Sequence, residues 1–271
     1  MRGVSHTDNS EFVELRGVKF AYSMHGIGPV AISAHGLSSS RANNRKIGMG
    51  NFSEVADAGY QVIAYDARGH GESTGTAVAE DYSWASLAED LLALADHFSP
   101  HAPIVGIGSS MGTGTLLHAA SQRPDRFSAL ILTAPPTAWE TRAGQAGVYR
   151  QIADIIEQGD PTSVATLFEQ TPIVVPPVFA DVTGFPAPPD IIFELLPFVF
   201  RGAGLSDLPS LELLSTVNQP TLLLPWSGDP GHPVITAETL LNVMPNAQLH
   251  VTHTHEDLLT WGSRAAEFLS S

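Results

Sequence analysis

The stretch Gly108-Ser109-Ser110-Met111-Gly112 has residue types and a spacing that could carry out nucleophilic catalysis. It matches G-x-S-x-G, the nucleophile elbow, in which a serine lies on a sharp turn between a strand and a helix. Such a turn strains the serine backbone, and small residues two positions before and after it let the backbone pass closely. Ser110 would then project as a nucleophile. A loop of small residues between a strand and a helix has the same composition, so the pentapeptide needs partners elsewhere in the chain.

A serine hydroxyl is a weak nucleophile and needs a neighbouring base, which is itself oriented by a buried carboxylate. Asp229 follows the apolar stretch 220–225, where a turn could direct its carboxylate across the end of a sheet. An ordinary turn aspartate before a proline is the alternative. For the base, the region after the last apolar stretch offers two histidines. We predict His255, which begins the last helical pattern, and keep His253 as the alternative.

The other histidines give no sign of a metal centre. His97, His101, His118 and His232 occur singly, on predicted helix faces or in turns, and His250 lies in a predicted strand. None has the spacing of a metal-binding motif, and no G-x-x-x-x-G-K phosphate loop is present. The chain also has no cysteine, which excludes a cysteine nucleophile, thiolate metal ligands and disulfides. We therefore predict neither a metal nor a cofactor.

The elements that must position these residues alternate along the chain. Short apolar stretches predict strands at residues 12–15, 18–22, 30–34, 61–65, 103–107, 129–133, 220–225 and 248–252. Amphipathic or small-residue patterns predict helices at residues 52–58, 82–98, 111–122, 235–243 and 256–269. This alternation is typical of an α/β protein whose mostly parallel sheet is covered on both faces. Such sheets bind ligands at the carboxyl ends of their strands, where the elbow and Asp229 are expected.

The alternation is interrupted over residues 137–218. A helix is predicted at residues 149–158, but residues 161–209 are crowded with proline and large apolar side chains, which is too apolar for a solvated linker. We predict a helical cap, inserted after the sixth strand, over a core formed by residues 1–136 and 219–271. A helical excursion that only completes the core is the alternative. The apolar side chains expected to line a pocket under the cap are Phe179, Phe185, Ile192, Phe193, Phe198 and Phe200.

Composition limits the partners. A chain of 271 residues with 43% hydrophobic residues can bury a sizeable core, and its net charge of −15 would repel phosphate backbones and anionic lipids. We predict no nucleic-acid or membrane partner. The polar N-terminal residues lack the apolar stretch of a signal peptide, and no segment has the length and hydropathy of a membrane span, so a cytoplasmic location is expected.

Together, these motifs resemble the α/β-hydrolase superfamily over nearly the whole chain outside the predicted cap. The resemblance rests on His35-Gly36-Leu37, the loop 65–73 (YDARGHGES), the elbow, Asp229 and His255, with serine, acid and histidine in the family's order. It implies a catalytic triad of Ser110, Asp229 and His255. It also implies an oxyanion hole formed by the backbone N–H groups of Leu37 and Met111.

One loop departs from the family pattern. Many relatives have a proline and a glycine soon after the histidine-glycine pair, whereas this chain has Ser38-Ser39-Ser40-Arg41. The basic residues Arg41, Arg45 and Lys46 could bind an anionic substrate group, but we predict that they form a solvated basic loop. In the loop 65–73, Asp66, Arg68 and His70 resemble the family's structural residues and are not expected to be catalytic.

The expected function is that of a serine hydrolase. It would cleave a small to medium-sized carboxylic ester, lactone or related carbonyl substrate with an apolar part, through an acyl-enzyme on Ser110. Three other functions share the scaffold: a carbon-carbon bond hydrolase of the ring-fission type, a cofactor-free perhydrolase or haloperoxidase, and a small-molecule receptor. The sequence identifies neither the substrate nor the oligomeric state, because the fold and the triad set the chemistry and the cap sets the choice of substrate.

Overall fold

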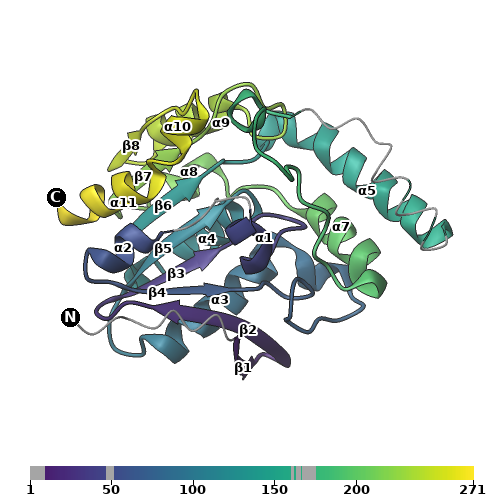
Figure 1. Ribbon diagram of the computed structural model, residues 1–271, viewed down its shortest axis with the longest axis horizontal. Helices are drawn as coiled ribbons and strands as arrows, with labels where there is room; N and C mark the ends of the chain where they lie inside the picture. Colours follow the sequence, from purple (N-terminus) through teal and green to yellow (C-terminus); the bar gives the residue numbers. More distant parts are fainter. Residues whose placement is uncertain (1–9, 47–51, 160–161, 163–165, 167–174) are drawn as a thin grey trace.

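A computed structural model describes residues 10–46, 52–159, 162, 166 and 175–271 (Figure 1). Within these residues, eight strands form one sheet in the order β1-β2-β4-β3-β5-β6-β7-β8. The strands are β1 (Glu11–Leu15), β2 (Val18–His25), β3 (Val30–Ala34), β4 (Gln61–Tyr65), β5 (Ile104–Ser109), β6 (Phe127–Thr133), β7 (Thr221–Leu224) and β8 (Ala247–Leu249). β2 pairs antiparallel with β1 and β4, and every other neighbouring pair is parallel. The predicted α/β class with a mostly parallel sheet is confirmed.

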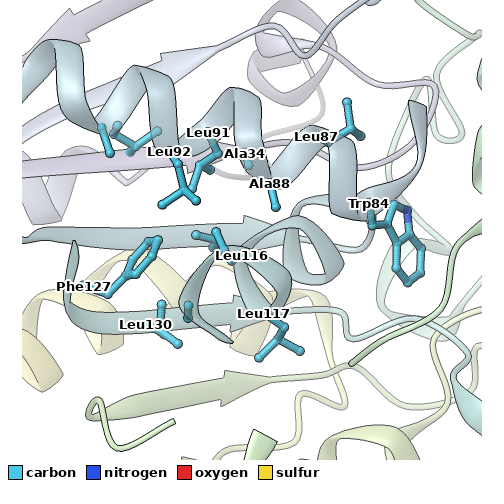
Figure 2. Close-up of a cluster of buried hydrophobic side chains, with 14 of the residues drawn as sticks. Ala34, Trp84, Leu87, Ala88, Leu91, Leu92, Leu116, Leu117, Phe127 and Leu130 are labelled. Atoms are coloured by element: carbon cyan, nitrogen blue, oxygen red, sulfur yellow. The ribbon is translucent and has the colours of Figure 1, made fainter. Parts of the chain in front are cut away.

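Helices cover both faces of this sheet because neighbouring strand residues point to opposite sides. In β6, Leu130 packs against a core that contains α3 (Trp84–Phe98) and α4 (Met111–Gln122). Ile131 belongs to a second core, on the face of α2 (Ser53–Asp57) and α11 (Trp261–Ser270). Figure 2 shows the first core, where leucines of α3 and α4 meet Phe127 and Leu130 of β6. Because central strands such as β6 are buried on both faces, their sequences are largely apolar and do not alternate between apolar and polar residues.

Several element boundaries differ from the predictions. A helix that the polar sequence did not indicate, α1 (Arg41–Lys46), follows the loop after β3. The predicted last helix divides into α10 (His255–Leu258) and α11, and the chain turns between them so that Trp261 is buried with its indole N–H donating to Thr252 Oγ1 at 2.7 Å. α9 (Val234–Val243) lies where a helix was predicted. Among helices of the described residues, none combines the length and apolar character needed to cross a bilayer.

The segment between β6 and β7 contains short 3₁₀ helices and α-helices among the described residues. The 3₁₀ helices are η3 (Trp139–Thr141), η4 (Pro177–Phe179) and η5 (Phe193–Leu195), and the α-helices are α5 (Arg142–Gln158), α7 (Leu196–Leu205) and α8 (Leu211–Leu214). Residues 160–161, 163–165 and 167–174 of the predicted cap lie outside the described residues. α5 and α7 pack against each other at one side of the molecule (Figure 1). Their apolar cluster contacts Leu37 in the loop after β3, and α7 also contacts η1 (Ala79–Tyr82) beyond β4. This segment therefore adjoins the loops at the carboxyl ends of the strands.

Asp190 ties the same segment to those loops through three hydrogen bonds. The Asp190 amide donates to the Ser38 carbonyl at 2.9 Å, and its own carbonyl accepts from the Gly71 amide at 2.9 Å. The hydroxyl of Ser40 donates to Asp190 Oδ2 at 2.6 Å. Since Ser38 and Ser40 follow β3 and Gly71 follows β4, Asp190 links two loops that the sheet alone leaves separate.

Gly112 lies where α4 approaches β3 tightly, so a substitution there tests whether this close approach is required for stability. An added Cβ would lie 2.2 Å from the Ala34 carbonyl oxygen, which is backbone and cannot turn aside. We expect Gly112→Ala to lower the free energy of unfolding by about 1–3 kcal/mol, as overpacking does. Urea denaturation would measure the change. Gly144→Ala is the control, because a Cβ there meets no heavy atom within 4 Å and should stabilise α5 slightly. Equal stability of wild type and Gly112→Ala would contradict this account.

Candidate active site

The elbow has the strained geometry that its sequence predicts. Ser110 lies between β5 and α4 with φ 53° and ψ −109°, a region that residues with a Cβ avoid. A Cβ on Gly108 would lie 2.5 Å from the Gly112 carbonyl oxygen, so the two flanking glycines are needed for the chain to pass itself. The Ser110 amide donates to the Thr133 carbonyl at 3.1 Å, which fastens the turn to β6. The serine side chain is thus held outside the regular strand and helix.

The imidazole of His232 lies between Ser110 and Asp229. Its Nε2 is 2.8 Å from Ser110 Oγ, and its Nδ1 is 2.8 Å from Asp229 Oδ2. Because a carboxylate only accepts hydrogen bonds, Nδ1–H must donate to Asp229, which leaves Nε2 of a neutral ring to accept the Ser110 proton. The arrangement can therefore take a proton from the serine hydroxyl and stabilise the resulting imidazolium.

Asp229 is held by three donors. Its Oδ2 accepts from His232 and from the indole N–H of Trp226 at 2.8 Å, and its Oδ1 accepts from the Gly231 amide at 2.8 Å. Burial by itself would raise the pKa of Asp229, but the contacts with His232, Trp226 and Gly231 outweigh it and lower the pKa to about 2. The carboxylate is therefore charged at neutral pH and fixed in orientation.

The histidine in this position differs from the prediction. The sequence predicts His255, with His253 as the alternative. In the structure, however, Nδ1 of His255 is hydrogen-bonded to the Val178 carbonyl at 3.1 Å, and His253 Nδ1 contacts Ser227 Oγ at 3.0 Å. The structure brings the predicted Ser110 and Asp229 together, but through His232.

The physical reason is the tight turn that follows Asp229. Pro230 and Gly231 occupy its two central positions, where proline and glycine are favoured, and the His232 amide donates back to the Asp229 carbonyl at 3.2 Å. The turn folds His232 back against the Asp229 carboxylate. The sequence Asp229-Pro230-Gly231-His232 is thus a local signal that places a histidine beside Asp229.

The predicted oxyanion donors lie on elements next to Ser110. A Cβ on Gly36 would be 3.4 Å from the Ser110 Cβ and 4.0 Å from its Oγ, which places the loop carrying Leu37 directly beside Ser110. Met111 begins α4, and the first amides of a helix have no carbonyl partner within it. Two elements that meet at Ser110 could thus direct backbone N–H groups to one point.

The loop after β3 is more buried than predicted. Arg41, expected in a solvated basic loop, is 5% exposed and its Nη2 lies 3.0 Å from Asp66 Oδ2 and 3.0 Å from Glu72 Oε2. Burial would raise the pKa of Asp66, but the hydrogen bonds and the charge of Arg41 outweigh it and lower the pKa. Arg45 and Lys46 are exposed, as expected. The ion pair of Arg41 and Asp66 consequently braces the loops after β3 and β4 instead of offering Arg41 to a substrate.

Comparisons with known proteins agree with this architecture. A family model described as the α/β-hydrolase fold matches residues 30–163. The crystal structure of a hydrolase from Pseudomonas aeruginosa PA01 has a TM-score of 0.76 at 19% identity and covers 98% of this chain and 100% of that one. The chain belongs to the α/β-hydrolase superfamily. Its sheet and flanking helices are the α/β-hydrolase fold, as the sequence motifs implied.

Two curated relatives of this α/β-hydrolase chain have different names. An epoxide hydrolase from Caballeronia sordidicola is 28% identical over 148 residues, 55% of this chain and 43% of that protein. A poly(3-hydroxyalkanoate) depolymerase from Ectopseudomonas oleovorans is 27% identical over 210 residues, 74% of this chain and 70% of that protein. The match thus spans less than half the length of the epoxide hydrolase.

The six apolar side chains predicted to line a pocket under the cap do not all lie together in the structure. Phe179 stacks on Phe185 with ring centroids 4.0 Å apart and belongs to the core on the α11 face. Phe200 joins the cluster of α5 and α7 that contacts Leu37. Ile192 and Phe193 are exposed, and Phe198 is half-buried. Of this set, Phe200 is the one whose cluster adjoins the loop beside Ser110.

Two buried histidines stabilise the loops of the α/β-hydrolase site in their neutral form. His35 Nε2 accepts from the Ala67 amide at 2.9 Å, so its proton is on Nδ1, which donates to the Gly36 carbonyl at 2.8 Å. His70 lies with its ring centroid 5.1 Å from that of His35, and its Nδ1 bonds to the Arg68 carbonyl at 2.9 Å. Burial, with the neighbouring His35, lowers the pKa of His70 from 6.5 to about 3.

This shift predicts a pH-dependent stability. Because the pKa of His70 is lower in the folded chain, the unfolded chain binds the extra proton and the free energy of unfolding falls as the pH drops below about 6.5. Between pH 7.5 and 5.5, His70→Asn should lose about 1 kcal/mol less stability than wild type in urea denaturation. Asparagine keeps a donor for the Arg68 carbonyl. The exposed His101, replaced in the same way, is the control. The same loss in His70→Asn and wild type would show that His70 is not the titrating group.

Proposed function

We propose that this chain is a serine hydrolase that cleaves carboxylic esters, lactones or related carbonyl substrates through an acyl-enzyme on Ser110. The observation that carries the proposal is the continuous set of hydrogen bonds from Ser110 Oγ through His232 to Asp229. A carboxylate, a correctly oriented imidazole and a strained serine are the parts that acyl transfer needs.

The reaction follows from the atoms in place. Ser110 Oγ attacks the substrate carbonyl carbon while His232 Nε2 takes its proton, and Asp229 stabilises the imidazolium through Nδ1–H. The amides of Leu37 and Met111 stabilise the negative charge on the carbonyl oxygen. His232 then gives the proton to the leaving alcohol, and the bond between the carbonyl carbon and that alcohol breaks. Water, deprotonated by His232, attacks the acyl-enzyme; His232 then returns this proton to Ser110 Oγ as the bond between Oγ and the acyl carbon breaks and the acid is released.

The segment 137–218 is proposed to act as a cap over this site. The cluster of Ala153, Ile156, Leu196 and Phe200 contacts Leu37, the residue whose amide is proposed to hold the oxyanion. Tyr149 and Ile152 of α5 pack on the same cluster and are partly buried. An apolar surface next to the oxyanion donors supports a substrate with an apolar acyl or alcohol part.

Ser110→Ala tests the nucleophile. We expect hydrolysis of p-nitrophenyl butyrate to fall by about 1000-fold or more, because the acyl-enzyme cannot form. Ser109→Ala is the matched control, since Ser109 lies in the same turn and should retain activity within about threefold. A fluorophosphonate probe should label wild type and Ser109→Ala but not Ser110→Ala. If folded Ser110→Ala kept full activity, the proposed function would be wrong.

A second pair of variants identifies the base. His232→Ala should lower kcat by about 1000-fold or more, because Ser110 loses its proton acceptor, whereas His255→Ala should stay within about tenfold of wild type. Steady-state kinetics on the same ester, with circular dichroism as a check on folding, makes the comparison. The reverse result, with His255→Ala inactive and His232→Ala active, would support the base expected from the family order.

A further inference from the structure

We propose that Trp226 is a positioning residue for the acid and the base of the proposed reaction. Its indole N–H holds Asp229 Oδ2, the oxygen that also accepts from His232, at 2.8 Å. Its ring meets the His232 imidazole at a centroid distance of 5.3 Å and an interplanar angle of 67°. The inference rests on the proposed function. The Trp226 side chain thus contacts both Asp229 and His232, which lie on the same loop as Trp226.

Trp226 is itself held firmly enough to act in this way. It is 4% exposed and stacks on Trp261 with centroids 5.7 Å apart and an interplanar angle of 9°. The Phe179 ring packs edge to face on the Trp226 indole, with ring centroids 5.0 Å apart. Its backbone forms a bridge with Thr252, and the Ser227 amide donates to the Thr252 carbonyl at 3.0 Å. The indole therefore has little freedom to follow Asp229 if the carboxylate moves.

The indole N–H has two separate effects on the dyad. It fixes the rotation of the Asp229 carboxylate, so the oxygen facing His232 stays in place without relying on the imidazole. It also competes with His232 for the negative charge of Asp229 Oδ2, because this one oxygen accepts hydrogen bonds from both the indole and the imidazole. Removing the N–H should lower the rate, since the imidazole is less well oriented. It should also leave more charge on Oδ2 to stabilise the protonated imidazole.

Trp226→Phe removes the donor and keeps an aromatic ring. For p-nitrophenyl butyrate we expect kcat to fall about tenfold with KM within about twofold, because orientation is lost and substrate contacts are kept. The midpoint of the acidic limb of the kcat/KM pH profile should move up by about half a pH unit, because the carboxylate then attracts the protonated base more strongly.

Trp261→Phe is the matched control. Trp261 stacks on Trp226, and its own indole donates to Thr252 Oγ1 at 2.7 Å. Its loss weakens the same packing without removing a donor to Asp229, so the acidic limb should keep its midpoint. If both variants lose the same kcat and neither moves the limb, Trp226 has only a packing role and the inference is overturned. The proposed function would still stand in that case, provided that Ser110→Ala is inactive. An active Ser110→Ala protein would instead reject the proposed function.

A measurement on the wild-type protein covers the case in which Trp226→Phe does not fold. In nitrogen-15 NMR spectra, the Trp226 indole resonance should titrate with the midpoint of the acidic limb, because its acceptor oxygen also serves the titrating base. The Trp261 indole, bonded to a neutral hydroxyl, should not follow that midpoint. A Trp226 signal that stays constant across the limb would overturn the inference.

Discussion

The backbone of Ser110 is in a left-handed conformation that an L-residue adopts only when its surroundings force it, at a cost of about 1–3 kcal/mol. The force comes from the close passage of α4 over β3, where Gly112 has no room for a Cβ beside the Ala34 carbonyl. Packing elsewhere in the molecule keeps α4 and β3 in this contact. Two apolar cores hold the strands and helices on either side of it, and the Ser110 amide is tied to β6. Without that packing the serine would relax into the helix and lose its position.

Asp229 and the histidine hydrogen-bonded to it, His232, lie on one short loop after β7, so this contact does not involve the loop after β8. Asp229 and His232 are three residues apart, and Trp226 at the start of the same loop contacts both. The histidines after β8 then make other contacts. His250 Nε2 lies 2.9 Å from the Asp257 carboxylate, and His255 bonds to the Val178 carbonyl in the segment between β6 and β7. In this arrangement the loop after β8 packs against its neighbours and the loop after β7 supplies the polar groups at Ser110.

Much of the fold could be predicted because the signals were local. The strands are continuous apolar stretches, and their alternation with helical patterns is enough to indicate a mostly parallel sheet. Elements that depend on distant contacts were missed. α1 is polar and is held by the ion pair of Arg41 with Asp66. α7 forms in a proline- and glycine-containing stretch because Gly202 allows a close approach to Tyr82, where a Cβ would lie 2.4 Å from the tyrosine Cβ. Neither contact can be read from the composition of the segment itself.

The sequence by itself determined the turn that carries Ser110, the sheet that delivers it and the position of Asp229 after β7. These depend on steric rules within a few residues and on the period of apolar side chains, which are written along the chain. Only the tertiary structure decided which histidine bonds to the serine. Ser110 and His232 are 122 positions apart, and a hydrogen bond of 2.8 Å between them depends on the paths of two loops fixed by packing. The eleven histidines of the chain carry the same side chain, and only their positions and surroundings in the fold distinguish them.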